Sequence, residues 1–197
     1  SVGAVVCAAG SGLAPADRKL YALRDITGTV ECIPLIASSI MSKKLAEGTS
    51  SLVLDVKFGN GAFMNDFDRA KELAGVLVRI GNDAGVATRA VLTNMNTPLG
   101  LAIGNANEVR ESVEVLAGGG PDDVVEITVT LAEHMLDLAG VTGVDVRDNL
   151  RNGKAMDVWR RMVSAQGGDP DAALPTPSET HAVVADRDGV VARMDAL

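Results

Sequence analysis

Residues 24–64 read RDITGTVECIPLIASSIMSKKLAEGTSSLVLDVKFGNGAFM, and these letters predict a loop, a helix, a strand and a glycine-rich turn in succession. Pro34 suits the first turn of a helix, and Gly48 suits the position just past its end. Together they predict a helix over 34–48. A strand over 52–56 follows, apolar on both faces, as in a parallel sheet that helices cover on each side.

Three polar side chains, Ser39, Ser42 and Lys43, share one narrow arc of the predicted helix. The rest of its circumference is mostly apolar, which predicts a buried element. The apolar positions are Leu35, Ile36, Ala37, Ile40, Met41, Leu45 and Ala46. An amine is seldom buried without a partner. The arc therefore faces either solvent or a ligand that needs a cation and hydroxyl groups.

The composition is that of a folded, acidic protein. The 197 residues allow one domain, or one and part of another, and the 47% of hydrophobic residues argue against a disordered chain. No apolar run reaches the roughly 18 residues of a membrane span. Lys and Arg number 18 against 26 Asp and Glu, a net charge of −8 without a basic cluster, so we expect neither nucleic acid nor membrane as a partner. Cys7 and Cys32 lack metal or redox spacing, which is typical of a reducing compartment and predicts a cytoplasmic location.

The alternation of strand and helix patterns along the chain predicts an α/β fold, with a mixed, largely parallel sheet flanked by helices. Besides those named above, the predicted strands lie at 2–9 and 86–92, the predicted helices at 66–81, 106–117, 121–140 and 154–166, and a predicted loop at 10–19.

We expect three segments. Residues 1–168 read as part of an α/β domain, because both ends of the chain look cut. Three prolines and no periodicity predict a linker over 169–178. Residues 179–197 read as the start of a C-terminal β-rich domain, since 181–185 and 190–194 flank an Asp-Arg-Asp-Gly turn that is typical of a hairpin.

The turn after the strand, residues 57–63, has glycines where the backbone must bend or approach a ligand closely. It lacks the GK[ST] ending of a phosphate-binding P-loop. Asp55 and Lys57 lie on one face of the preceding strand, so they form either a structural ion pair or part of a catalytic site.

Arg24, in the loop before the helix, joins Ser39 and Lys43 as a candidate binding residue. Arginine and lysine donate to carbonyl oxygens, and a serine hydroxyl both donates and accepts. A flat ring with carbonyls and a ring N–H, such as a pyrimidine base, would suit all three. If the base departs from a sugar, negative charge builds on it, and fixed cations stabilise that transition state more than the ground state. From spacing alone, a structural lysine and a surface arginine are equally good interpretations.

Several long strings of the sequence closely resemble the thymidine and pyrimidine-nucleoside phosphorylase family. They are PADRKLYALRDITGTVECIPLIASSIMSKKLAEG at 15–48, LDVKFGNGAFM at 54–64, TNMNTPLGLAIGNANEVRESVE at 93–114 and NGKAMDVWRRMVSAQGGDP at 152–170. The resemblance covers essentially the whole chain. It implies a glycosyltransferase that cleaves a pyrimidine nucleoside with phosphate, giving the free base and a (deoxy)ribose 1-phosphate.

The resemblance also implies site residues. Arg24, Ser39 and Lys43 match the family's base-binding residues, and Phe63 matches an aromatic that lines the base pocket. Arg24 and Lys43 would be catalytic, because they stabilise the departing base, while Ser39 would read its N3–H and carbonyl edge.

The resemblance implies no organic cofactor, with phosphate as co-substrate and a possible K⁺ ion. The backbone oxygens of Leu99 and Ala102 and the carboxylate of Glu111 match the cation ligands of some members. From the residues alone, Glu111 lies opposite an apolar helix stripe and reads as a solvated surface acid.

Other parts of the family pattern have no match in this chain. These are the N-terminal phosphate-binding portion with the family histidine, the helical lobe that implies a homodimer, and most of the C-terminal domain. His134 and His181 do not match the family histidine, and we expect both to be structural. We therefore expect the chain to supply the base-binding half of the site and to be inactive alone.

Two alternatives from other functional classes stay open at this point. A phosphoribosyltransferase of related architecture, such as anthranilate phosphoribosyltransferase, would depend on phosphoribosyl pyrophosphate and would not cleave thymidine. A non-catalytic base-binding protein would bind thymine without turnover.

Overall fold

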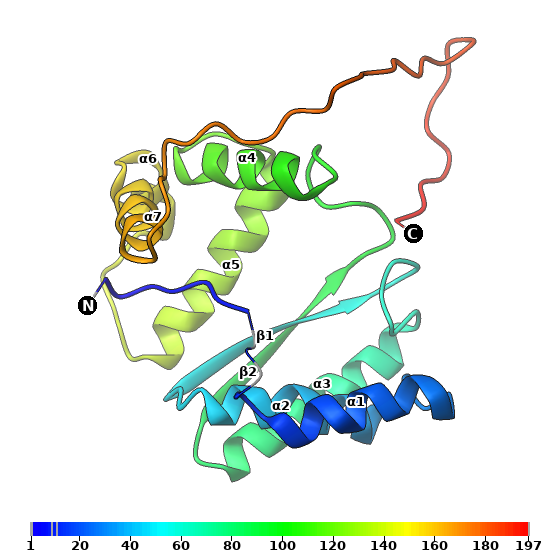
Figure 1. The fold of residues 1–197 in the computed structure, drawn as a ribbon, viewed down its shortest axis with the longest axis vertical. Helices are drawn as coiled ribbons and strands as arrows, with labels where there is room; N and C mark the ends of the chain where they lie inside the picture. The colour runs from blue at the N-terminus through cyan, green and yellow to red at the C-terminus, as the bar shows by residue number, and fades with distance from the viewer. Residues whose placement is uncertain (1, 9, 11, 197) are drawn as a thin grey trace. The chain divides into compact units, whose positions relative to one another are not determined.

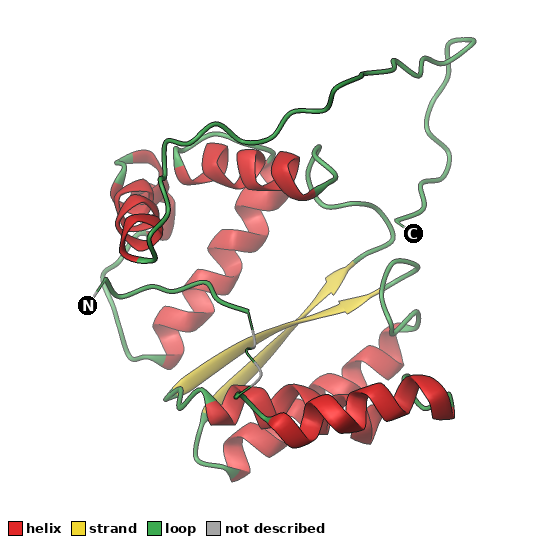
Figure 2. Cartoon of the chain, viewed as in Figure 1, coloured by secondary structure: helices red, strands yellow, loops and turns green. Residues whose placement is uncertain are grey.

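The computed structural model describes residues 2–8, 10 and 12–196. Its elements are α1 (Pro15–Thr27), α2 (Ile33–Ala46), β1 (Ser51–Phe58), α3 (Phe67–Asp83), β2 (Ala87–Asn94), α4 (Asn105–Leu116), α5 (Asp122–Leu138), α6 (Val146–Arg151) and α7 (Lys154–Ala165) (Figures 1 and 2). The chain divides into two compact units. The sheet unit holds Val6–Asn96 with Thr128–Val144, and the helical unit holds Thr97–Ile127 with Asp145–Ala196.

The sheet unit is built on a parallel pair of strands. β1 and β2 run in register from Ser51 beside Ala87 to Phe58 beside Asn94, and α3 makes the crossover between them. Helices α1, α2 and α3 lie on the same side of this sheet (Figure 1). Met41 of α2 and Leu77 of α3 are completely buried in the core they share with β1. The predicted α/β fold with a parallel sheet flanked by helices is confirmed.

The two helices of this core follow from their sequence signals. In α3 the carboxylate of Asp66 accepts from the amides of Asp68 and Arg69, at 2.9 and 3.0 Å, and caps the helix. Its buried stripe is Ala70, Leu73, Ala74 and Leu77. In α2 a proline occupies the first turn, as predicted. The helices predicted over 66–81 and 34–48 are therefore confirmed.

The predicted loop over 10–19 is wrong in its second half, because α1 begins at Pro15. Proline at the first helical position is pre-organised for a helix. The helix ends where Gly28, at φ +63°, donates its N–H to the carbonyl of Arg24. Arg24 therefore lies on a helix rather than in a loop.

The helical unit contains α4, α6, α7 and the first turns of α5. Helices α4, α5 and α7 confirm three predictions. The six-residue helix α6 was not predicted, since it is too short for apolar periodicity, although Asp145 caps it by accepting from the amide of Asp148 at 2.8 Å.

Two strand predictions are wrong. Residues 2–8 form no strand, and the described sheet consists of β1 and β2, so this apolar run joins no sheet. Ala9, the end of that predicted strand, lies outside the described residues. The predicted hairpin is also absent from the described part of 181–194: Val183 and Val190 are 90% and 92% exposed. A lone two-stranded hairpin is at best marginally stable in water, and here no apolar face is buried to support one. The linker and the separate C-terminal domain stay predictions.

Among the described residues, no helix combines the length and the apolar composition that a membrane crossing requires.

Candidate functional site

The four predicted base-binding residues meet in one cavity of the sheet unit. Arg24, Ser39, Lys43 and Phe63 all line a space of about 240 Å³ between α1, α2 and the turn after β1. The remaining lining residues are Tyr21, Val30, Ile36 and Ile40. A mostly apolar cavity with a few convergent polar groups is the usual form of a small-molecule site.

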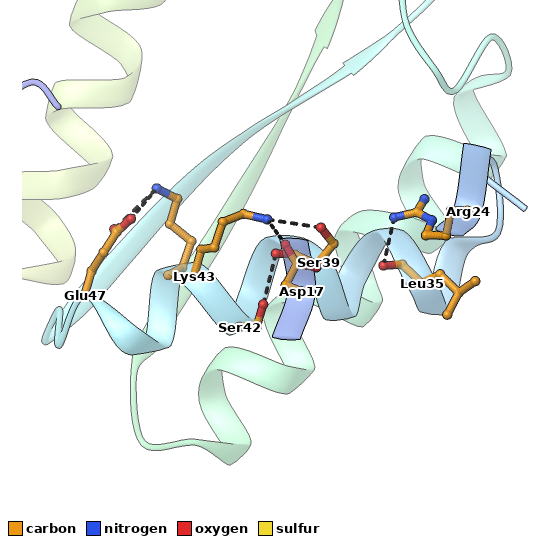
Figure 3. A network of polar contacts seen from close by, with 8 residues as sticks. Asp17, Arg24, Leu35, Ser39, Ser42, Lys43 and Glu47 are labelled. Atoms are coloured by element: carbon orange, nitrogen blue, oxygen red, sulfur yellow. Dashed lines mark hydrogen bonds and ion pairs between the residues drawn. The ribbon is translucent and has the colours of Figure 1, made fainter. Parts of the chain in front are cut away.

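Lys43 is held in place by two partners on adjacent helices. Its Nζ donates to Oδ2 of Asp17 at 2.6 Å and to Oγ of Ser39 at 3.1 Å (Figure 3). Ser39 lies one turn before Lys43 on α2, which explains that contact. An ammonium group carries three N–H donors. Among the described residues, these contacts leave one donor of Lys43 for a ligand.

Asp17 was not predicted, although α1 places it on the face of the helix that carries Tyr21 and Arg24. Its burial acts to raise the pKa of its carboxyl group. Hydrogen bonds from Lys43 and Ser39 and the positive charges of Lys43 and Arg24 outweigh that effect and lower the pKa below its ordinary value. Asp17 is therefore a carboxylate at neutral pH. A prediction of α1 would have placed Asp17 beside Tyr21 and Arg24, because these three residues are spaced by four and then three positions.

Arg24 is buried, with 6% of its surface exposed, so the interpretation as a surface arginine is wrong. Its guanidinium donates to the carbonyl of Leu35 at 3.3 Å, to that of Thr29 at 3.4 Å, and to that of Val30. It also lies over the ring of Tyr21, 5.1 Å from the centroid. Three of its five N–H groups thus tie α1 to the loop before α2 and to the first turn of α2. Arg24 also lines the cavity.

Phe63 lies in the turn after β1 and is 68% exposed. With Ile36 and Ile40 it also lines a second, largely apolar cavity of about 370 Å³, which reaches Asp55 and Lys57. The ring of Phe63 therefore stands where the two cavities adjoin.

Asp55 and Lys57 form the ion pair that their spacing on one strand face allowed. Nζ of Lys57 lies 2.7 Å from Oδ2 of Asp55, and the hydroxyl of Thr93 on β2 donates to Oδ1 at 2.5 Å. The carboxylate of Asp55 is thus bonded by one side chain from each strand, Lys57 of β1 and Thr93 of β2.

In the helical unit, Glu111 is half-buried, and its carboxylate contacts the loop before α4. Its Oε1 accepts from the amide of Leu101 at 2.9 Å. Its Oε2 lies against Gly100, where a Cβ would stand only 2.1 Å away. Ala102 and Glu111 line the same cavity. The carboxylate therefore faces the loop that contains Leu99 and Ala102, the segment expected to supply the other cation ligands.

Comparisons with known proteins identify the family. Residues 1–156 match the family described as glycosyl transferase family, a/b domain. A thymidine phosphorylase of Mycobacterium tuberculosis is 60% identical over 196 residues, which are 100% of this chain and 46% of the relative. A pyrimidine-nucleoside phosphorylase of Bacillus subtilis is 47% identical over 195 residues, 93% of this chain and 45% of the relative. One of Staphylococcus epidermidis is 50% identical over 173 residues, 85% of this chain and 40% of the relative.

The chain thus spans less than half the length of these relatives. The family match nevertheless covers both strands of the sheet and every residue of the cavity described above. On this evidence, the chain belongs to the glycosyl transferase family with an α/β domain.

Proposed function

We propose that this chain supplies the base-binding half of an enzyme that cleaves thymidine or related pyrimidine nucleosides with phosphate, giving the free base and a (deoxy)ribose 1-phosphate. The names of the relatives, thymidine phosphorylase and pyrimidine-nucleoside phosphorylase, support this reaction. The observation that carries the proposal is the convergence of Arg24, Ser39 and Lys43 in a single cavity.

In the proposed mechanism, a phosphate oxygen attacks the anomeric carbon of the sugar while the bond from that carbon to the base nitrogen breaks. The bonding electrons leave with the base, and the sugar takes on oxocarbenium character. Lys43 and Arg24 donate to the base oxygens, where negative charge accumulates, and Ser39 reads the N3–H and carbonyl edge. Because both cations are fixed before the reaction, they stabilise the transition state without reorganising.

The proposal extends to the rest of the enzyme. We expect phosphate to be bound by residues outside this chain, the enzyme to be a homodimer formed through an N-terminal helical lobe, and its location to be the cytoplasm. No organic cofactor is required, because the reaction is a displacement by phosphate.

An assay of the full-length protein tests this function. Thymidine incubated with phosphate should release thymine, and omission of phosphate should abolish the release. Consumption of phosphoribosyl pyrophosphate without cleavage of thymidine would replace the proposal with a phosphoribosyltransferase. Thymine binding in calorimetry without any turnover would replace it with a binding protein.

We further propose that K⁺ binds in the helical unit, held by the backbone oxygens of Leu99 and Ala102 and by Glu111. An all-oxygen donor set suits this ion, whose hydration shell carbonyl oxygens can replace. The contact of the Glu111 carboxylate with the amide of Leu101 fits such a site, since it brings the acid to the loop. The ion would fix this loop and would take no part in the displacement.

A denaturation series tests the cation site. KCl at about five times the dissociation constant should raise the free energy of unfolding by about 1 kcal/mol relative to tetramethylammonium chloride at equal ionic strength. Glu111→Gln should remove this difference, whereas Glu126→Gln, the same change at an exposed position of α5 in the same unit, should retain it. Equal stability of the wild type in both salts would contradict the site.

A further inference from the structure

A carboxylate from α1 stands behind the proposed base pocket. Oδ2 of Asp17 lies 2.6 Å from Nζ of Lys43, and the side chain of Asp17 is 14% exposed. Among the described residues that line the cavity, Asp17 is absent. It therefore meets a bound base only through the lining residues that donate to it, Lys43 and Ser39.

We propose that Asp17 is a positioning residue: it fixes the ammonium group of Lys43 so that the remaining N–H faces the departing base. This inference rests on the proposed function. Asp17 and Ser39 take two of the three donors of Lys43, and Figure 3 shows both contacts of the ammonium group. The direction of the third donor is then set by tetrahedral geometry rather than by the motion of a long side chain.

Asp17 has two opposing effects on the reaction, and their balance decides whether its removal lowers or raises kcat. The negative charge of Asp17 offsets part of the attraction between Lys43 and a negatively charged base. Against this, a long lysine side chain loses rotamer entropy when it is ordered. Asp17 orders Lys43 before the base arrives, from outside the cavity, so we expect positioning to outweigh the offset of charge.

The lowered pKa of Asp17 agrees with this role, because a carboxylate that stays ionised holds Lys43 throughout the neutral range. Helix α1 also offers a matched control. Asp25 is exposed on the same helix, and no side-chain contact of Asp25 is found among residues 2–8, 10 and 12–196.

The test is a double-mutant cycle in the full-length enzyme. Asp17→Asn keeps the size of the side chain and removes its charge. We expect it to lower kcat for thymidine phosphorolysis about tenfold with KM changed less than about threefold, since the loss falls on the transition state. Asp25→Asn should change kcat less than about twofold. In the Lys43→Ala background, Asp17→Asn should have almost no further effect, because the residue through which it acts is missing.

Three results would overturn the positioning role. The first is an unchanged or higher kcat in Asp17→Asn. The second is a loss of kcat on Asp17→Asn that is as large in the Lys43→Ala background as in the wild type, which would mean that Asp17 acts through the fold. Asp17→Glu retains the carboxylate and should keep kcat within about threefold of the wild type. The third result that would overturn the role is a tenfold loss of kcat in Asp17→Glu. If Asp17→Asn does not fold, the cycle is run with Asp17→Ala, which also removes the carboxylate. Failure of the proposed function would be distinct, since the wild-type enzyme itself would then release no thymine from thymidine and phosphate.

Discussion

Replacing Lys43 by alanine in the full-length protein should lower kcat/KM for thymidine phosphorolysis about 100-fold, which corresponds to about 2.7 kcal/mol of transition-state stabilisation. Lys43 lines the cavity and has one donor left after its bonds to Asp17 and Ser39. In the proposed mechanism, that donor faces the negative charge of the departing base. Steady-state kinetics with saturating phosphate measure the effect.

The neighbouring residue provides the control for this experiment. Lys44 has the same chemistry and lies on the same helix, but it pairs with Glu47 at 3.2 Å and lines no wall of the base cavity. Lys44→Ala should leave kcat/KM within about twofold of wild type, because isolated surface ion pairs contribute little. A Lys43→Ala enzyme as active as Lys44→Ala would remove the lysine from the mechanism.

Arg24→Lys should lower the free energy of unfolding by about 2 kcal/mol, even though the positive charge is retained. The guanidinium of Arg24 bonds to the carbonyls of Thr29, Val30 and Leu35 at once. The single ammonium group of a lysine cannot reach all three, so partly buried carbonyls lose their donors. Because the same loop forms a wall of the cavity, kcat/KM should fall as well. Urea denaturation measures the first effect.

Arg18→Lys is the matched substitution, since Arg18 is exposed on the same helix. It should change the free energy of unfolding by less than about 0.5 kcal/mol. If the two variants unfolded at the same urea concentration, Arg24 would not be holding the loop between α1 and α2.

The sequence was sufficient for the elements whose signals are local. Helix α2 follows from its proline and glycine, and α3 follows from Asp66 and an apolar stripe. The arc of Ser39 and Lys43 was visible for the same reason, since residues four apart on a helix are neighbours.

The sequence was insufficient where the deciding contact is long-range or made by the backbone. Lys43 and Asp17 are 26 positions apart, and no pattern within α2 announces a carboxylate from α1. The acceptors of Arg24 are main-chain carbonyls, which side-chain chemistry does not reveal. The contact of Glu111 was not predicted either, because its partner, the amide of Leu101, also belongs to the backbone.

The hairpin failed for a different reason. Its turn signal was sound, but a hairpin needs an apolar face buried against something. Val183, Val184, Val190 and Val191 remain at least 77% exposed. Local turn chemistry alone therefore did not determine the structure of 181–194.

A crystal structure of the full-length protein with thymine tests the central claim most directly. The account predicts thymine in the cavity of Arg24, Ser39, Lys43 and Phe63, with a base carbonyl within hydrogen-bonding distance of Nζ of Lys43. Thymine bound elsewhere, with this cavity empty and Lys43 contacting only Asp17 and Ser39, would contradict it.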